Sequence, residues 1–200
     1  MKYTQEAIYN LALNHLGVSA IVQNTADKNP RVTVLNNFYS LAKEETAKAF
    51  DWNFLNRVAE LTPSSEKCPD PRFVYAYDYP NDCISARYIL LENNEKYKKF
   101  DVTTDSKGNK IIVCNQSPAH LVYTRLLNVA VPETFFTAEY VSALSWYLAF
   151  LCAIPIVGNA QTEQKCYQGY QMAIARAKAM NANESVNEDE DDSTYLDARN

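Results

Sequence analysis

The sequence predicts an α+β protein: a four-helix bundle with an inserted, mostly antiparallel β-sheet and an acidic C-terminal arm. Two patterns lead to this prediction. Near both ends of the chain, apolar residues recur every three or four positions, which is the spacing of a helix with one buried face. Between residues 57 and 130 the spacing falls to two, which is typical of strands. With 47% hydrophobic residues among 200, the chain can bury a core.

The changes in spacing divide the chain. We expect residues 1–56 and 131–183 to form the helical bundle, and residues 57–130 to form the inserted sheet subdomain. Residues 184–200 hold seven acids and one base, a composition that predicts a flexible, solvated arm. The total charge is −5 and the arm contributes −6, so the rest of the chain carries +1. Residues 1–183 therefore lack the excess of basic residues that is typical of proteins that bind nucleic acid.

Capping residues place the first two helices. Thr4 can cap the first helix, and Gly17 follows it as a stop. Asn29 and Pro30 open the second, because proline is favoured at the first helical position. The expected helices span 4–16, 30–50, 133–154 and 159–181. The expected buried face of the first helix is Ile8, Leu11, Ala12, His15 and Leu16. That of the second helix is Val34, Phe38, Leu41, Ala42 and Ala49, with Glu45 as a polar member. That of the fourth helix is Cys166, Tyr167, Tyr170, Ala173, Ile174 and Ala177.

The third helix is expected to begin at Glu133 and Thr134 and to end before Pro155 and Gly158. Residues 140–157 are eighteen uncharged residues, which is nearly the length of a membrane span. The serines and the proline within them, and the absence of basic residues just upstream, favour a helix buried in a core instead. We therefore expect no membrane span.

Alternation between apolar and polar residues predicts four to six strands in the middle of the chain. The expected strands are 57–61, 73–79, 84–91, 97–103, 110–115 and 121–127. Tyr75, Tyr77 and Tyr79 share one face of the second strand. Such a face can stack nucleobases. Sheets that do so usually alternate aromatic residues with lysine or arginine, whereas here the alternating residues are uncharged or acidic. Packing against helices or an aromatic protein interface is the favoured use.

Few residues qualify for catalysis. Cys114 and His120 could form a thiol–imidazole dyad, although no feature of the sequence would lower the pKa of the thiol. Asp78 and Asp82 flank a turn and could act as paired carboxylates, although a turn-bracing aspartate is the favoured interpretation. The phosphate-loop, dinucleotide, serine-elbow and zinc-helix patterns are absent. We expect no enzyme.

Nor does the sequence predict a metal site or a cofactor. The five cysteines show no close pairing and the chain has two histidines, so clustered metal ligands are absent. Free thiols and the lack of a signal-peptide pattern at the N-terminus fit a protein made in a reducing cytoplasm.

Four stretches in order resemble a known family: AIYNLALNHLGVSAI, AKAFDWNFLNRVAELT, FVYAYDYPNDCISARYI and LVYTRLLNVAVPETFFTAEYVSALSWYLAFLCAIPI. Together with the Tyr- and Ala-rich last helix, they resemble the head–tail adaptor of short-tailed bacteriophages, the tail tubular protein A family. One departure is that Leu126, Leu127 and Asn128 follow Tyr123-Thr124-Arg125, where that family usually has acidic residues.

The resemblance implies a structural virion protein, assembled in the bacterial cytoplasm, with no enzymatic centre. It implies a homo-oligomeric ring of about twelve copies, closed by head-to-tail contacts, between the portal protein and the tail nozzle protein. DNA would pass through the lumen without sequence-specific binding. A virion-associated cell-wall hydrolase and a small intracellular binding module remain alternatives. Within the arm, Tyr195, Leu196 and Arg199 are the expected partner-binding residues.

Overall fold

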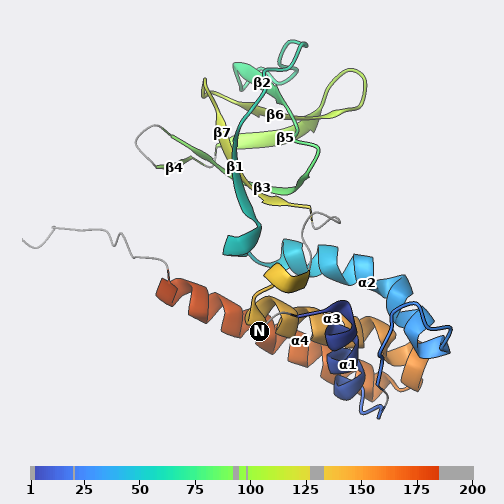
Figure 1. The fold of residues 1–200 in the computed structure, drawn as a ribbon. Helices are drawn as coiled ribbons and strands as arrows, with labels where there is room; N and C mark the ends of the chain where they lie inside the picture. Colours follow the sequence, from blue (N-terminus) through green and yellow to red (C-terminus); the bar gives the residue numbers. More distant parts are fainter. Residues whose placement is uncertain (1–2, 20, 92–94, 98, 127–132, 185–200) are drawn as a thin grey trace, which may run out of the picture.

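The computed structural model describes residues 3–19, 21–91, 95–97, 99–126 and 133–184 of the chain. Within these residues the fold is α+β, with four α-helices and two antiparallel β-sheets. The sheets lie together at one end of the molecule and the helices at the other, joined by a short connection (Figure 1). The predicted fold class is confirmed at this level.

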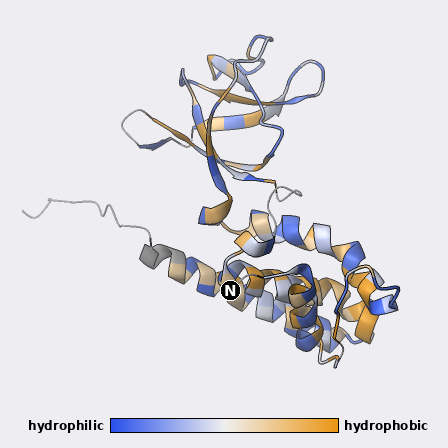
Figure 2. Cartoon of the chain, in the orientation of Figure 1, coloured by the Kyte–Doolittle hydropathy of each residue, from blue (hydrophilic) through white to orange (hydrophobic). Residues whose placement is uncertain are grey.

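Three helices pack around a central fourth. The helices are α1 (Gln5–His15), α2 (Pro30–Ala49), α3 (Ala138–Val157) and α4 (Ala160–Glu184). The most extensive packing of α3 is against α4, followed by α2 and then α1. Figure 2 shows hydrophobic residues along α3, which has the most hydrophobic sequence of the four helices. The core of this part is therefore built around α3, because each neighbour buries an apolar face against it.

The capping predictions hold for the first two helices. The Thr4 hydroxyl accepts a hydrogen bond from the Ala7 N–H at 3.3 Å, and Asn29 Oδ1 accepts one from the Arg31 N–H at 2.9 Å. Pro30 is the first residue of α2, as expected. Helix α1 ends at His15 with Leu16 as its C-cap, and Gly17 then adopts a φ of 74°, a conformation that glycine enters without steric cost.

The predicted limits of the third helix are wrong at both ends. Glu133–Phe135 forms a separate 3-10 turn, η2, and α3 begins only after Thr137, whose hydroxyl accepts from the Tyr140 N–H. The Glu133 carboxylate accepts a hydrogen bond from the Tyr39 hydroxyl, which fastens this turn to α2. At the other end, Pro155 lies inside the helix. The helix stops at Gly158, whose φ of 70° places it in the left-handed conformation.

The predicted buried face of α2 is also wrong in part. Leu41 is 47% exposed, whereas Tyr39 and Thr46 are buried. Tyr39 can be buried because its hydroxyl has a partner in Glu133 and its ring meets Tyr9 edge-on at 5.3 Å. Counting apolar residues alone had favoured the neighbouring face. The residues that α2 buries are Val32, Leu35, Tyr39, Ala42, Thr46 and Ala47.

The middle of the chain forms two sheets, where the sequence predicted one. The strands are β1 (Asn56–Glu60), β2 (Tyr75–Asp78), β3 (Cys83–Leu90), β4 (Lys96–Tyr97), β5 (Phe100–Thr104), β6 (Lys110–Cys114) and β7 (His120–Arg125). One sheet has the order β1-β7-β3-β4 and the other β2-β6-β5. The predicted strand 97–103 is divided, because β4 pairs with β3 while β5 pairs with β6 in the second sheet.

A second hydrophobic core lies between the two sheets. Tyr77 and Ile112 come from one sheet, and Ile89, Leu121 and Tyr123 from the other. Alternation identifies the inward face of each strand but not its neighbours, so the division into two facing sheets could not be predicted from spacing.

One arginine fastens the sheets to the helices. Arg87 of β3 donates to the Phe50 carbonyl at the end of α2 at 3.0 Å, and to the Thr124 hydroxyl of β7 at 2.8 Å. Asp51 lies 3.6 Å from its guanidinium. The chain passes from α2 to β1 through a 3-10 turn, η1 (Asn53–Leu55). Because Arg87 bonds both sides of this connection, it restrains the junction.

Candidate interaction surfaces

The proposed thiol–imidazole dyad does not form. Cys114 is fully buried in β6, and burial raises the pKa of its thiol. Its sulfur approaches the Gln116 carbonyl at 3.6 Å. His120 begins β7, opposite Glu60 and Leu90 in the strand register. No contact among the described residues joins the sulfur to the imidazole. A buried thiol with a raised pKa is a poor nucleophile.

The two candidate carboxylates have separate surroundings. Asp82 accepts hydrogen bonds from the Tyr123 hydroxyl at 2.8 Å and from Arg57 at 2.7 Å. Burial and this carboxylate raise the pKa of Tyr123 to about 12. Asp78, at the end of β2, is exposed. No interaction within the described residues joins Asp78 to Asp82. Asp82 therefore ties the turn before β3 to side chains of β1 and β7, whereas the favoured interpretation expected it to bond the backbone of the turn.

Asp78 instead lines a polar groove at one end of the two sheets. We call it the polar groove; its volume is about 820 Å³. Its acidic lining residues are Glu60, Asp78 and Asp105. Hydrogen bonds from Asn109 and the backbone lower the pKa of Asp105, which keeps that group ionised and unsuited to act as a general acid. Across the described part of the chain, no three His, Cys, Asp or Glu side chains gather as metal ligands.

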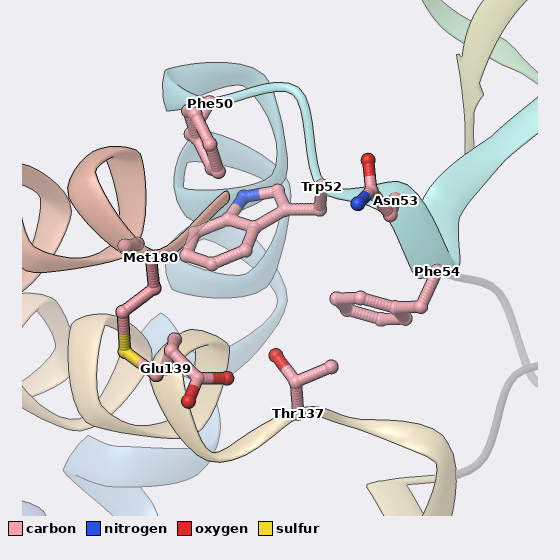
Figure 3. A pocket seen from close by; sticks show the side chains of 8 residues that line it. Phe50, Trp52, Asn53, Phe54, Thr137, Glu139 and Met180 are labelled. Atoms are coloured by element: carbon pink, nitrogen blue, oxygen red, sulfur yellow. The ribbon is translucent and has the colours of Figure 1, made fainter. Parts of the chain in front are cut away.

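A pocket forms where the helices meet the connection to the sheets. We call it the aromatic pocket; its lining residues are Phe50, Trp52, Asn53, Phe54, Thr137, Glu139, Ala177 and Met180. Figure 3 shows Trp52 and Phe54 facing Thr137, Glu139 and Met180 across the hollow. Its volume is about 60 Å³. Ligand sites have volumes of several hundred cubic ångströms, so this hollow is too small for a metabolite and has room for part of a side chain.

The wall of the aromatic pocket is rigid and its rim is adaptable. The Trp52 indole N–H donates to the Thr46 carbonyl at 2.8 Å, and its ring meets Phe50 and Tyr140 edge-on. Met180 is 49% exposed and supplies a flexible thioether. No hydrogen bond or ion pair from another described residue reaches the half-buried Glu139 carboxylate.

A second aromatic surface runs along α3 and α4. We call Tyr147, Phe150, Tyr167 and Tyr170 the aromatic patch. Ring centroids lie 4.7 Å apart for Tyr147 and Tyr170, and 5.2 Å apart for Phe150 and Tyr167. Burial, with smaller effects from neighbouring groups, raises the pKa of Tyr170 to about 12, so its hydroxyl stays neutral at ordinary pH. Tyr167 remains 42% exposed, and Ile154 next along α3 is 48% exposed. Clustered aromatic residues at a surface are typical of protein interfaces.

The sequence identified these surfaces only in part. Tyr167 and Tyr170 were expected in the buried stripe of the fourth helix, but they form the half-exposed aromatic patch. The tyrosine face of β2 packs inward at Tyr77, while Tyr75 lies at the surface. The aromatic pocket was not predicted, because it joins residues far apart in sequence; the aromatic density of AFDWNF was its only signal. The expected partner-binding residues Tyr195, Leu196 and Arg199 lie outside the described residues.

Helix α3 is long and apolar enough to be considered as a membrane-spanning helix. By length and composition it is the one helix in the described ranges that could cross a bilayer. Half of its apolar stretch is buried against the other helices. The core helix of a water-soluble protein has the same features, so this is weak evidence for a span.

Comparison of the chain with models of known protein families and with curated proteins finds no match.

Proposed function

We propose that this chain is a structural virion protein, the adaptor subunit between the portal and the tail nozzle of a short-tailed bacteriophage. Copies of it close into a ring of about twelve, through which DNA leaves the capsid without sequence-specific binding. The protein has no catalytic role and no cofactor, and it does not span a membrane. It is assembled in the bacterial cytoplasm. The sequence resemblance supports this proposal.

In this proposal the four helices act as one bundle, the two sheets are an insertion, and residues 184–200 are an acidic arm. Tyr195, Leu196 and Arg199 near the end of that arm contact the portal protein or a neighbouring subunit. The arm's negative charge keeps it away from DNA. The near-neutral body suits a conduit, because a strongly basic lumen would hold DNA through many phosphate contacts.

The aromatic patch is the observation that carries the proposal. It lies on the α3–α4 hairpin, where Tyr167 and Ile154 leave apolar surface exposed. A ring subunit needs a lateral face that neighbours can bury, and half-exposed aromatic residues supply the required area at small entropic cost. We propose that the aromatic patch is part of this lateral face.

The test mixes the purified chain with the portal protein of the same virus. Light scattering and negative-stain images should show rings or portal-bound collars. Tyr167→Glu should weaken assembly at least about tenfold, because it places a charge in the interface centre. Met172→Glu is the matched control: it changes an exposed apolar residue of the same helix on a face away from the aromatic patch. Equal assembly by both variants, or a mixture that stays two species, would contradict the proposal.

A cell-wall hydrolase is the second candidate, and the polar groove is what favours it. Its volume suits an extended saccharide, and Glu60 and Asp78 are carboxylates within its lining. The test is release of soluble fragments from purified peptidoglycan. Turnover that Asp78→Asn or Glu60→Gln abolishes, with the fold intact, would favour the hydrolase over the adaptor. A chain that neither assembles nor cleaves would leave a small binding module as the better description.

A further inference from the structure

The aromatic pocket has the dimensions and the chemistry to receive one side chain from a protein segment. The hollow of about 60 Å³ holds about two water molecules, close to the space that a branched aliphatic group needs. Phe50, Trp52 and Phe54 supply an apolar wall. Glu139 places beside that wall a carboxylate that no other described residue pairs with, so an occupant should combine an apolar side chain with a nearby cation.

The chain itself carries such a segment close to the pocket. Residues 185–200 contain one base, Arg199, and it stands three positions after Leu196. Met180 of α4 lines the pocket, and the helix continues for only one more turn, to Glu184. The C-terminal segment therefore starts beside the pocket.

The length of the connection allows that segment to return. Leu196 lies twelve residues after Glu184, and twelve extended residues reach at most about 40–43 Å. The distance back from Glu184 to Met180 is only about one helical turn, roughly 6 Å. Because the segment is tethered, its effective concentration at the pocket is on the order of millimolar, so even weak contacts can hold it there.

We infer that the aromatic pocket is the docking site for residues 193–199 of the same chain, with the Leu196 side chain in the hollow and the Arg199 guanidinium on the Glu139 carboxylate. Tyr195 lies at the rim, against the exposed thioether of Met180. The inference concerns the isolated chain, so it can fail while the adaptor proposal stands. Within an adaptor ring, the same docking would withhold the arm from its partners until assembly releases it.

The experiment uses fluorine NMR of the full chain labelled with 5-fluorotryptophan. The chain has two tryptophans, Trp52 in the pocket wall and Trp146 in α3, so the second signal is an internal control. Leu196→Asp should move the Trp52 signal and leave the Trp146 signal in place. Val186→Asp is the matched control, because it makes the same apolar-to-acid change within the arm but outside residues 193–199. It should leave both signals unchanged.

A second measurement keeps the test independent of any one variant. A synthetic peptide of residues 185–200 is added to the full chain and to a chain ending at Glu184, whose fold is checked by the Trp146 signal. The truncated chain should bind the peptide at least about tenfold more tightly, because the tethered segment occupies the pocket of the full chain. Glu139→Lys in the truncated chain should abolish this binding, and a peptide with Arg199→Glu should restore it.

Three results would overturn the inference. The first is a Trp52 signal that is the same in the full chain and in Leu196→Asp. The second is equal peptide binding by the full and truncated chains. The third is a Trp52 signal of the full chain that changes with protein concentration, since this would make a second copy the occupant.

Discussion

Gly169 of α4 packs directly against the Trp146 ring of α3. A Cβ atom built there would lie 2.5 Å from two atoms of the Trp146 ring, which is shorter than any real contact. The same indole stacks on His15 of α1, with ring centroids 3.6 Å apart. The indole therefore has little room to move away, and three helices are fixed at one point.

We predict that Gly169→Ala destabilises the protein by about 1–3 kcal/mol, the usual cost of overpacking. In an ordinary helix the same change stabilises by roughly 0.5–1 kcal/mol, so the sign is diagnostic. Urea unfolding gives the free energy. The exposed neighbour Gln168 offers the control, since Gln168→Ala should change stability by less than about 0.5 kcal/mol. A stabilised Gly169→Ala variant would show that Trp146 moves freely.

His15 makes the stability of the helices depend on pH. Burial, with a smaller effect of Lys165, lowers the pKa of His15 to about 4. The Ser145 hydroxyl donates to the Ser142 carbonyl, so in its contact with His15 Nε2 at 3.1 Å it accepts. Nε2 thus carries the proton of the neutral ring, and charging the ring adds a proton at Nδ1.

In the unfolded chain the pKa of this histidine is near 6.5, so as the pH falls the unfolded chain binds the proton at a higher pH than the folded chain does. The stability that the neutral His15 ring contributes is therefore fully present above about pH 6.5, decreases as the pH falls toward 4, and is absent below that. Part of the ring faces solvent, which screens the effect, so we expect a loss of about 1–2 kcal/mol. Urea midpoints across this range measure it. His15→Gln should remove this component, whereas His120→Gln should retain it; equal curves for both variants would contradict the assignment.

Among the elements, the four helices and the change from helix to strand were predictable, whereas the number of strands, seven instead of four to six, and their partners were not. The start of α2 follows from Asn29 and Pro30, because capping depends on residues next to each other in sequence. The inward face of α2 depends instead on Glu133, almost a hundred positions away, which provides a partner for the Tyr39 hydroxyl. The pairing of β7 between β1 and β3 is equally non-local. Spacing along one strand holds no information about its neighbours.

The junction between sheets and helices gives the prediction at this scale. Arg87→Met should cost about 2–3 kcal/mol, because it leaves the buried Thr124 hydroxyl and the Phe50 carbonyl without their charged donor. Hydrogen exchange of residues 50–55 should speed up in the variant. The control is Arg57→Met, which removes a more exposed ion pair with Asp82 and should cost no more than about 1 kcal/mol. Equal losses would mean that Arg87 adds nothing special to the junction.

At the scale of the whole molecule, the chain has two hydrophobic cores. One lies among the helices and includes Trp52 and Leu55; the other lies between the sheets. The polar groove belongs to the sheets. The aromatic patch and the aromatic pocket belong to the helical part, where the pocket gathers residues from three separate stretches of the chain. Sequence spacing could predict that aromatic residues occur there. It could not predict that Met180 and Phe54 line the same hollow, since that depends on how α4 crosses α3.

Two cores predict that the helical part can fold without the sheets. Strand β1 enters the sheet beside the point where β7 leaves it, since Asn56 pairs with Thr124. Paired Cα atoms lie about 4.5–5.5 Å apart, so two glycines replacing residues 57–123 can join the cut ends. We expect this shortened chain to keep a helical circular dichroism spectrum and the near-ultraviolet signal of its two tryptophans.

The shortened chain should be less stable than the full chain, because it loses the Arg87 hydrogen bond to Phe50 and the packing of Ile84 on the helical core. The control is the full chain carrying Arg87→Met, which removes the first of these contacts and keeps the sheets. Native-state hydrogen exchange of the full chain gives an independent check, since the amides of the two cores should open with different free energies. A shortened chain without tryptophan signals, together with one common opening energy for both cores, would show that the two cores fold as a single unit.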